Sequence, residues 1–340
     1  MSGKKYKIAI DGMGGDNAPA IVVDGVCRAA LMVDAELILV GDKNAILEKL
    51  SEHRHVPENI SIVPASEVIE MHEPPAQSIR RKKDSSINVA VNLVKNNQAD
   101  AFISAGNTGA VVCAASLFLK QLNGIERPGI MVVMPTLKGP AVIIDAGANI
   151  GPKPKHLLNY GIMGSVYMKY ILKKEDPKVG LLNIGEEASK GTDFVKETFK
   201  LLEQAPINFI GNMEGRDIFA GKCDVIVCDG FVGNIVLKVS EGVADAIKQM
   251  FKQRISNNYF AKLGLLFSKS ALSALKKDID YAEYGGAPLL GINSVGIISH
   301  GGSSSKAVKN AVRVAYETLE NKVNQHIVEE MTKVEYMNNG

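Results

Sequence analysis

The sequence has few residues that can form covalent or metal cross-links. Its 340 residues include six histidines and four cysteines, which are Cys27, Cys113, Cys223 and Cys228. The cysteines lie in apolar runs without a C-x-x-C spacing, and the histidines form no metal-ligand pattern with them. We therefore expect reduced cysteines, a cytoplasmic protein and no bound metal.

Long apolar runs and an excess of one charge are also missing. No apolar run reaches the length that a membrane-spanning helix needs, and the basic N-terminus leads directly into the strand-like KIAID without the apolar core of a signal peptide. The 39 basic side chains nearly balance 37 acidic ones, for a net charge of +2. We expect a protein that does not span a membrane and does not coat nucleic acid.

Several familiar catalytic motifs are absent. The sequence contains neither G-x-x-x-x-G-K-[ST] nor G-x-S-x-G, and Asp16 and Asn17 interrupt the G-x-G-x-x-G pattern after Gly12, Gly14 and Gly15. These absences argue against a P-loop NTPase, a standard NAD-binding protein and an α/β-hydrolase with a serine nucleophile. The chemistry is expected to proceed without a covalent nucleophile.

Short β-branched runs that end in Gly, Asn or Asp alternate with helical patterns along the chain. This alternation predicts an α/β fold with a doubly wound, mostly parallel sheet, which we expect to form a single α/β/α domain over residues 1–340. The predicted strands are Lys7 to Asp11, Leu37 to Gly41, Ile60 to Val63, Ala101 to Ser104, Ile130 to Met134, Val142 to Asp145, Val179 to Asn183, Asn208 to Ile210 and Asp224 to Cys228.

The loops after these strands are rich in Gly, Asn and Asp. They include DGMGGDNAP, SAGNTGA, DAGAN, NIGEEASKG, GNMEGRD, CDGFVGN and SHGGSS. Glycine lets the backbone approach a ligand closely, and N–H groups at a helix start favour an anion, so the set indicates a phosphate-bearing substrate. For any single loop, the ordinary preference of turns for these residues is an equal alternative.

A helical hairpin insertion is predicted at about 246–277. This segment carries seven Lys or Arg residues and no acid, and Ile247, Met250, Phe251 and Ile255 follow helical spacing. Apolar anchors flanked by cations suit an anionic membrane surface or an acidic partner protein, and burial against a second subunit is the alternative. The expected contact residues at the tip are Lys262, Leu263, Leu265, Leu266, Phe267 and Lys269.

Taken together, the motifs resemble the phosphate acyltransferase family, also called acyl-carrier-protein:phosphate transacylase. The resemblance runs from about Lys7 to about Tyr316 and is carried by DGMGGDNAP, ASEVIEM, RRKKDSS, SAGNTGA, LLNIGEE, FIGNMEGRD and CDGFVGNIVLK. It implies a fold related to phosphotransacetylases and isocitrate-type dehydrogenases, and a reaction that makes acyl phosphate from long-chain acyl-carrier protein and inorganic phosphate for phospholipid synthesis. It also implies a homodimer, a membrane glycerol-3-phosphate acyltransferase as the next enzyme, and no cofactor beyond the carrier's own acyl-phosphopantetheine.

Such a reaction needs groups that hold phosphate and stabilise an oxyanion. The candidate catalytic residues are Lys190 as a cation, Asp229 and Glu186 as groups that orient phosphate or accept its proton, and His300 as a titratable donor. The candidate binding residues are Gly106, Asn107, Thr108, Gly109, Asn149, Asn212, Gly230, Gly233 and Asn234. Structural alternatives remain open: Asp229 as a helix cap, Glu186 in a first helical turn, and His300 as a turn residue.

Cys228 and the RRKKDSS segment each allow a structural and a functional interpretation. Cys228 is more consistent with a buried thiol than with a nucleophile, and RRKKDSS suits either docking of an acidic carrier protein or a solvated turn with a helix N-cap.

Three other functions compete with acyl transfer from a carrier protein. They are those of a short-chain acyl-CoA phosphotransacetylase, a dehydrogenase of related fold and a non-catalytic scaffold recruited to membranes. The basic hairpin favours a carrier-protein or membrane context.

Overall fold

The computed structural model describes residues 5–256 and 283–339. The predicted tip of the hairpin, including Lys262, Leu263, Leu265, Leu266, Phe267 and Lys269, lies outside the described residues.

In the described part of the chain, eleven strands form one sheet in the order β3-β2-β1-β4-β11-β10-β5-β6-β9-β7-β8. The strands are β1 (Tyr6–Asp11), β2 (Ala35–Gly41), β3 (Ile60–Pro64), β4 (Ala101–Ser104), β5 (Gly129–Thr136), β6 (Gly139–Ile144), β7 (Lys178–Leu182), β8 (Asn208–Met213), β9 (Val225–Val227), β10 (Ala287–Leu290) and β11 (Val295–Ile298). Every predicted strand is present, and β10 and β11 are additional. The predicted fold class is confirmed, since only β10 and β5 at the centre run antiparallel to both neighbours.

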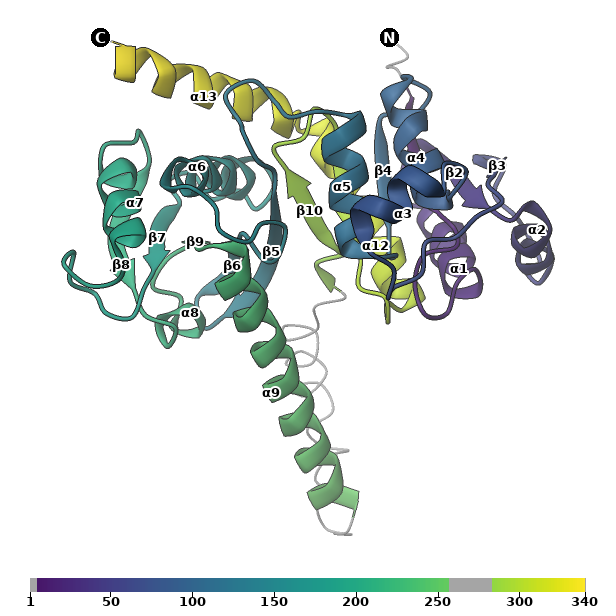
Figure 1. Ribbon diagram of the computed structural model, residues 1–340. Helices are drawn as coiled ribbons and strands as arrows, with labels where there is room; N and C mark the ends of the chain where they lie inside the picture. The colour runs from purple at the N-terminus through teal and green to yellow at the C-terminus, as the bar shows by residue number, and fades with distance from the viewer. Residues whose placement is uncertain (1–4, 257–282, 340) are drawn as a thin grey trace.

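Helices cover both faces of the sheet (Figure 1). They are α1 (Ala20–Ala29), α2 (Lys43–Ser51), α3 (Pro75–Arg81), α4 (Ser86–Lys95), α5 (Thr108–Phe118), α6 (Pro154–Tyr170), α7 (Asp193–Glu203), α8 (Asp217–Ala220), α9 (Gly230–Ser256), α12 (Ser305–Glu320) and α13 (Val323–Asn339). Because both faces are covered, strands such as β4, β6 and β9 are buried along most or all of their length and consist mainly of apolar residues.

The molecule has two halves that meet at β10 and β5. One half contains β1 to β4, β11 and helices α1 to α5 and α12, and the other contains β6 to β9 and helices α6 to α8 (Figure 1). Helix α1 packs against α12 in the first half, and α6 packs against α7 and α13 in the second. At this junction β11, β10, β5 and β6 pair antiparallel, so the parallel strands of the two halves run in opposite directions.

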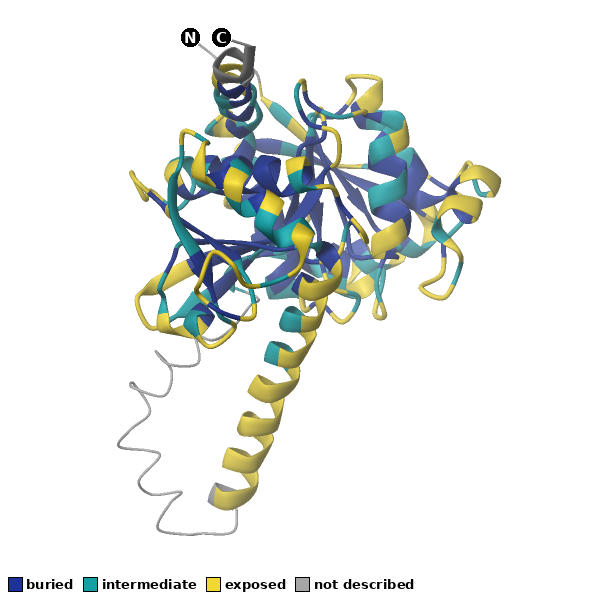
Figure 2. Cartoon of the chain, turned by 60° about the vertical axis from the view of Figure 1, so that its left-hand side comes forward, coloured by how far each residue is buried: buried dark blue, intermediate teal, exposed yellow. Residues whose placement is uncertain are grey.

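Helix α9 leaves the body at this junction and extends away from it (Figure 1). It begins at Gly230, directly after β9, so the helix predicted from Ala246 onward is the outer part of a longer element. Figure 2 shows that burial is confined to the base of α9 and that its outer turns are exposed. Among the described residues, no helix combines the length and the apolar character needed to cross a bilayer.

Candidate active site

A cavity of about 450 Å³ lies at the junction between the two halves. One wall comes from residues that follow β4 and β11, another from residues that follow β6 and β9, and β5 with α9 completes it. Most of the lining is apolar, with Ile130, Val132, Met134, Leu237 and Ile298 among its side chains. Polar groups are fewer, and this combination is typical of a pocket for a largely apolar ligand with one reactive polar end.

The start of α5 reaches this cavity through Thr108 and Gly109, both predicted as binding residues. Asn107 is the N-cap, and its Oδ1 accepts the N–H of Ala110 at 3.0 Å. Helix starts favour anions because their first N–H groups lack acceptors within the helix. Thr108 and Gly109 therefore offer an anion site at the edge of the cavity.

Asn107 has a structural task in place of the predicted contact with phosphate. Its Nδ2 lies 3.1–3.2 Å from the carbonyl oxygens of Glu70, Met71 and Glu73 and donates to them. These bonds hold the loop before α3 against the start of α5. The side-chain amide is fully engaged, so Asn107 positions the anion site and does not itself offer a donor to it. Gly106 is likewise buried behind the helix start, where its N–H donates to Ser104 Oγ at 3.1 Å.

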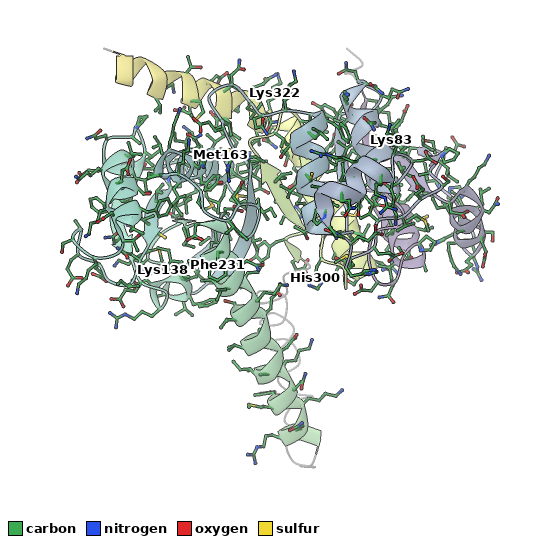
Figure 3. The ribbon with its side chains drawn as sticks, in the orientation of Figure 1. Lys83, Lys138, Met163, Phe231, His300 and Lys322 are labelled. Atoms are coloured by element: carbon green, nitrogen blue, oxygen red, sulfur yellow. The ribbon has the colours of Figure 1, made fainter. Side chains whose placement is uncertain are left out.

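His300 follows β11 and lies at the cavity beside the base of α9 (Figure 3). Its Nδ1 accepts the N–H of Gly302 at 3.1 Å. A neutral imidazole has one acceptor nitrogen and one N–H, so this bond places the ring proton on Nε2. His300 is therefore a turn residue, as the sequence analysis considered. The bond from Gly302 fixes the ring and leaves Nε2–H as its donor.

Lys238 on α9 completes a polar cluster at the cavity. Its Nζ lies 3.4 Å from His300 Nε2 and 3.0 Å from Glu241 Oε2. Since both Nζ and Nε2 carry protons, the two donors converge and suit a shared anionic acceptor. The sequence analysis did not select Lys238, although it lies one helical turn after the predicted Asn234, which also lines the cavity.

The start of α9 is held by bonds within the chain. Asp229 Oδ1 accepts the N–H groups of Phe231 at 3.0 Å and Val232 at 3.1 Å, so the capping role considered for Asp229 is present. Gly230 N–H donates to Asn149 O, and Gly233 N–H donates to Asp229 O. All four N–H groups from Gly230 to Gly233 thus have acceptors, and this loop orders the helix without leaving an N–H free for phosphate.

Asn149 and Asp145 lie beneath this helix start. Asp145 is fully buried and accepts N–H groups of Ile130, Gly147, Ala148 and Asn149 at 2.8–3.1 Å, while burial raises the pKa of its carboxyl group. The side-chain amide of Asn149 donates to Pro128 O, Asp145 Oδ2 and the Tyr160 hydroxyl. Asn149 therefore belongs to a buried support for α9 and does not line the cavity.

Lys190 and Glu186 lie elsewhere, in the loop after β7, and Asn212 lies within β8. None of the three lines the cavity. Glu186 forms an ion pair with Lys222 at 2.7 Å, and it lies in an irregular loop, so its placement in a first helical turn is wrong. Asn212 donates to Glu187 O at 2.9 Å and holds this loop in place. The structure thus separates the predicted residues into three groups: those that line the cavity, those that support its walls, and those around β7 and β8.

Cys228 and the RRKKDSS segment (residues 80–86) have the structural roles that the sequence analysis considered for them. Cys228 is buried at the end of β9, and burial raises the pKa of its thiol well above the usual range, as expected of an unreactive thiol. Ser85 is the N-cap of α4 and accepts the N–H of Asn88. Lys82 donates to Val68 O and pairs with Glu73, whereas Arg80 and Arg81 are exposed. In the described residues, no three His, Cys, Asp or Glu side chains gather to hold a metal ion.

The sequence is similar to that of a known protein family over most of its length. Residues 6–326 match the family described as "Fatty acid synthesis protein". The chain is 47% identical over 325 residues to the phosphate acyltransferase of Geotalea daltonii, covering 96% of this chain and 94% of that protein. It is 51% identical over 328 residues to the phosphate acyltransferase of Desulfitobacterium hafniense strain DCB-2, covering 96% and 98%.

Solved structures share the fold at lower identity. A phosphotransacetylase from Streptococcus pyogenes superposes with a TM-score of 0.64 at 20% identity, covering 94% of this chain and 95% of that one. A branched-chain phosphotransacylase from Enterococcus faecalis V583 gives a TM-score of 0.53 at 13% identity, covering 92% and 99%. These likenesses establish the architecture.

Proposed function

The chain belongs to the phosphate acyltransferase family, and we propose that it transfers a long-chain acyl group from acyl-carrier protein to inorganic phosphate. The product is an acyl phosphate for phospholipid synthesis. One observation carries the proposal: the cavity of about 450 Å³ joins a long apolar wall to the convergent donors of Lys238 and His300. The apolar wall suits an acyl chain, and the donors suit phosphate.

The reaction follows from this arrangement. Lys238 Nζ, His300 Nε2–H and the N–H groups at the start of α5 hold phosphate beside the thioester. A phosphate oxygen attacks the carbonyl carbon, the C–O bond forms, and the C–S bond breaks. The departing thiolate takes the proton that phosphate gives up, so no covalent enzyme intermediate is needed. A thiol with a pKa of about 8.5 is a good leaving group, and we propose that the reaction uses no cofactor of its own.

Short-chain acyl-CoA phosphotransacetylase activity is the second candidate, because the fold is shared with phosphotransacetylases. The apolar wall favours the long-chain reaction, since an acetyl group would leave β5 residues such as Val132 and Met134 uncovered. A membrane-recruited scaffold would leave the cluster of Lys238 and His300 without a role, and a standard NAD-dependent dehydrogenase is disfavoured by the interrupted G-x-G-x-x-G pattern.

We further propose that the protein is a cytoplasmic homodimer that works at the inner face of the membrane. Exposed apolar side chains recur every fourth residue along α9, at Phe231, Ile235, Val239, Val243, Ile247 and Phe251, with exposed fractions of 46–59%. Such a stripe is consistent with burial against a second copy of the chain, while the basic segment beyond it suits an anionic bilayer. The product would pass to a membrane glycerol-3-phosphate acyltransferase.

The test is a direct assay with competing donors. The protein is incubated with phosphate and either palmitoyl-carrier protein or acetyl-CoA, and acyl phosphate is trapped with hydroxylamine as the hydroxamate. We expect rapid, phosphate-dependent formation of palmitoyl hydroxamate. Efficient use of acetyl-CoA alone would favour the second candidate, and the absence of hydroxamate from both donors would refute acyl transfer to phosphate. Co-sedimentation with anionic and neutral vesicles tests the membrane proposal separately.

A further inference from the structure

Ser299 follows β11 and contributes to the cavity wall next to His300 in the chain. Its N–H donates to Ser104 O at 2.8 Å, which fixes its backbone against the end of β4. The residue is 3% exposed, and its Oγ is buried without a hydrogen-bond partner. Within the described residues, three other buried side-chain oxygens lack partners, in Asn88, Asn159 and Asn212, and none of these residues lines the cavity.

The neighbouring strand explains why the hydroxyl has no partner. Ala287 pairs with Ile298 across β10 and β11, which brings Gly286 opposite Ser299. Gly286 has a φ of +84°, a conformation that side chains other than glycine rarely adopt, and a Cβ placed there would lie 3.1 Å from Ser299 Oγ. The hydroxyl therefore faces a position without a side chain, and Gly286 itself lines the cavity.

A buried hydroxyl without a partner costs stability, because folding removes its bonds to water and returns none. A second serine in the same cavity behaves differently: Ser240 Oγ donates to Val236 O at 2.7 Å within α9. The donor of Ser299 is thus unused in a residue that lines the cavity. Its Oγ has less than 1 Å² of exposed surface, so rotation about χ1 is the movement that brings it to a ligand atom there.

We propose that Ser299 Oγ donates a hydrogen bond to the acyl carbonyl oxygen of the bound thioester. This inference rests on the proposed function. A buried neutral donor suits an oxygen that is uncharged in the ground state and gains negative charge as phosphate attacks. The cation Lys238 is better suited to phosphate, which is charged from the outset. When the phosphate oxygen bonds to the carbonyl carbon, the π electron pair of the carbonyl moves to the carbonyl oxygen. This pair re-forms the C=O bond as the C–S bond breaks.

The experiment compares Ser299→Ala with Ser165→Ala. Ser165 on α6 is the matched control, because its hydroxyl donates to Gly161 O at 2.8 Å and the residue does not line the cavity. With palmitoyl-carrier protein and phosphate, we expect Ser299→Ala to lower kcat by about tenfold to a thousandfold while changing KM for the acyl donor less than about threefold. Ser165→Ala should keep kcat within about twofold of the wild type. Because burying the unpartnered hydroxyl of Ser299 destabilises the folded protein, Ser299→Ala should unfold at the same temperature as the wild type or higher.

Two outcomes would overturn the inference: wild-type kcat in Ser299→Ala, or a loss of kcat accompanied by a lower melting temperature, which would indicate a structural role. Ser299→Cys provides a second check, because a thiol occupies the same place but donates weakly, and its kcat should fall between those of the alanine variant and the wild type. Failure of the wild-type protein to form acyl phosphate would refute the proposed function itself, a result distinct from either outcome above.

Discussion

Lys238 on α9 places its ammonium group 3.4 Å from Nε2 of His300, which lies 62 residues later in the chain. The backbone N–H of Gly302 donates to Nδ1 of the same ring, so the imidazole proton is on Nε2. Two donors from separate elements therefore converge at one cavity. This pair carries the assignment of the phosphate site.

Replacing Lys238 with alanine should lower kcat/KM for phosphate by about tenfold or more, equivalent to about 1.4 kcal/mol, because a charge-assisted bond to the anion is lost. Initial rates at varied phosphate concentration measure the effect. Lys248→Ala, an exposed lysine farther along the same helix, is the control and should behave as the wild type. Equal kinetics for both variants would remove Lys238 from the site.

Replacing His300 with alanine should weaken the use of phosphate by about tenfold, and His300→Gln should recover part of the loss. Glutamine carries an N–H donor near the position of Nε2, whereas alanine offers none. Steady-state kinetics at several phosphate concentrations separate the two variants. If glutamine and alanine proved equally impaired, the Nε2–H donor would not be the group that matters.

Replacing Val132 with phenylalanine should shorten the preferred acyl chain. Val132 lies on β5 and lines the cavity, so a larger side chain fills space that we assign to the acyl group. We expect kcat/KM to fall by about tenfold or more for palmitoyl donors and by less than about threefold for butyryl donors, since each lost methylene contact contributes roughly 1 kcal/mol. Val132→Ala should retain long-chain activity. A uniform loss for all chain lengths would contradict this assignment.

Glu73 should contribute stability that depends on pH. A hydrogen bond from Lys82, together with bonds from Glu70 N–H and Ser78, lowers the pKa of Glu73 from 4.5 to about 2. For an acid with a lowered pKa in the folded state, the stabilisation is present above the unfolded value of 4.5 and is lost as pH falls toward 2. The difference in unfolding free energy between wild type and Glu73→Gln should therefore be largest near neutral pH and shrink below pH 4.5.

Urea titrations at pH 7, 5 and 3 measure this dependence. Glu70→Gln is the matched control, because Glu70 is exposed and takes part in the turn through its backbone N–H. A difference between wild type and Glu73→Gln that stays constant from pH 7 to pH 3 would show that the pKa of Glu73 is not lowered.

Local sequence was sufficient to predict the strands and to offer two helix caps as alternatives, because these features depend on neighbouring residues. Apolar β-branched runs become buried strands, and Asp229 and Ser85 accept N–H groups within three residues of themselves. The cap at Asn107 was missed, since that residue was expected to contact phosphate. The strands β10 and β11 escaped prediction because neither is an uninterrupted β-branched run: β10 reads APLL, with a proline and no β-branched residue, and Gly296 interrupts β11. The absence of a reactive thiol at Cys228 also followed from its place at the end of an apolar strand.

The composition of the site was decided by the tertiary structure. Glycine-rich loops with similar sequences have different tasks: the loop at Thr108 reaches the cavity, the loop at Gly230 bonds to its own chain, and the loop at Lys190 lies after β7, on the far side of β9 from β6. Loop composition does not reveal which N–H groups find acceptors, because those acceptors come from distant segments. The sequence does not distinguish Lys238 from other helical lysines, and only the fold places it beside His300. The hydroxyl of Ser299 likewise lies next to Gly286, which immediately precedes β10 and offers no side chain to it.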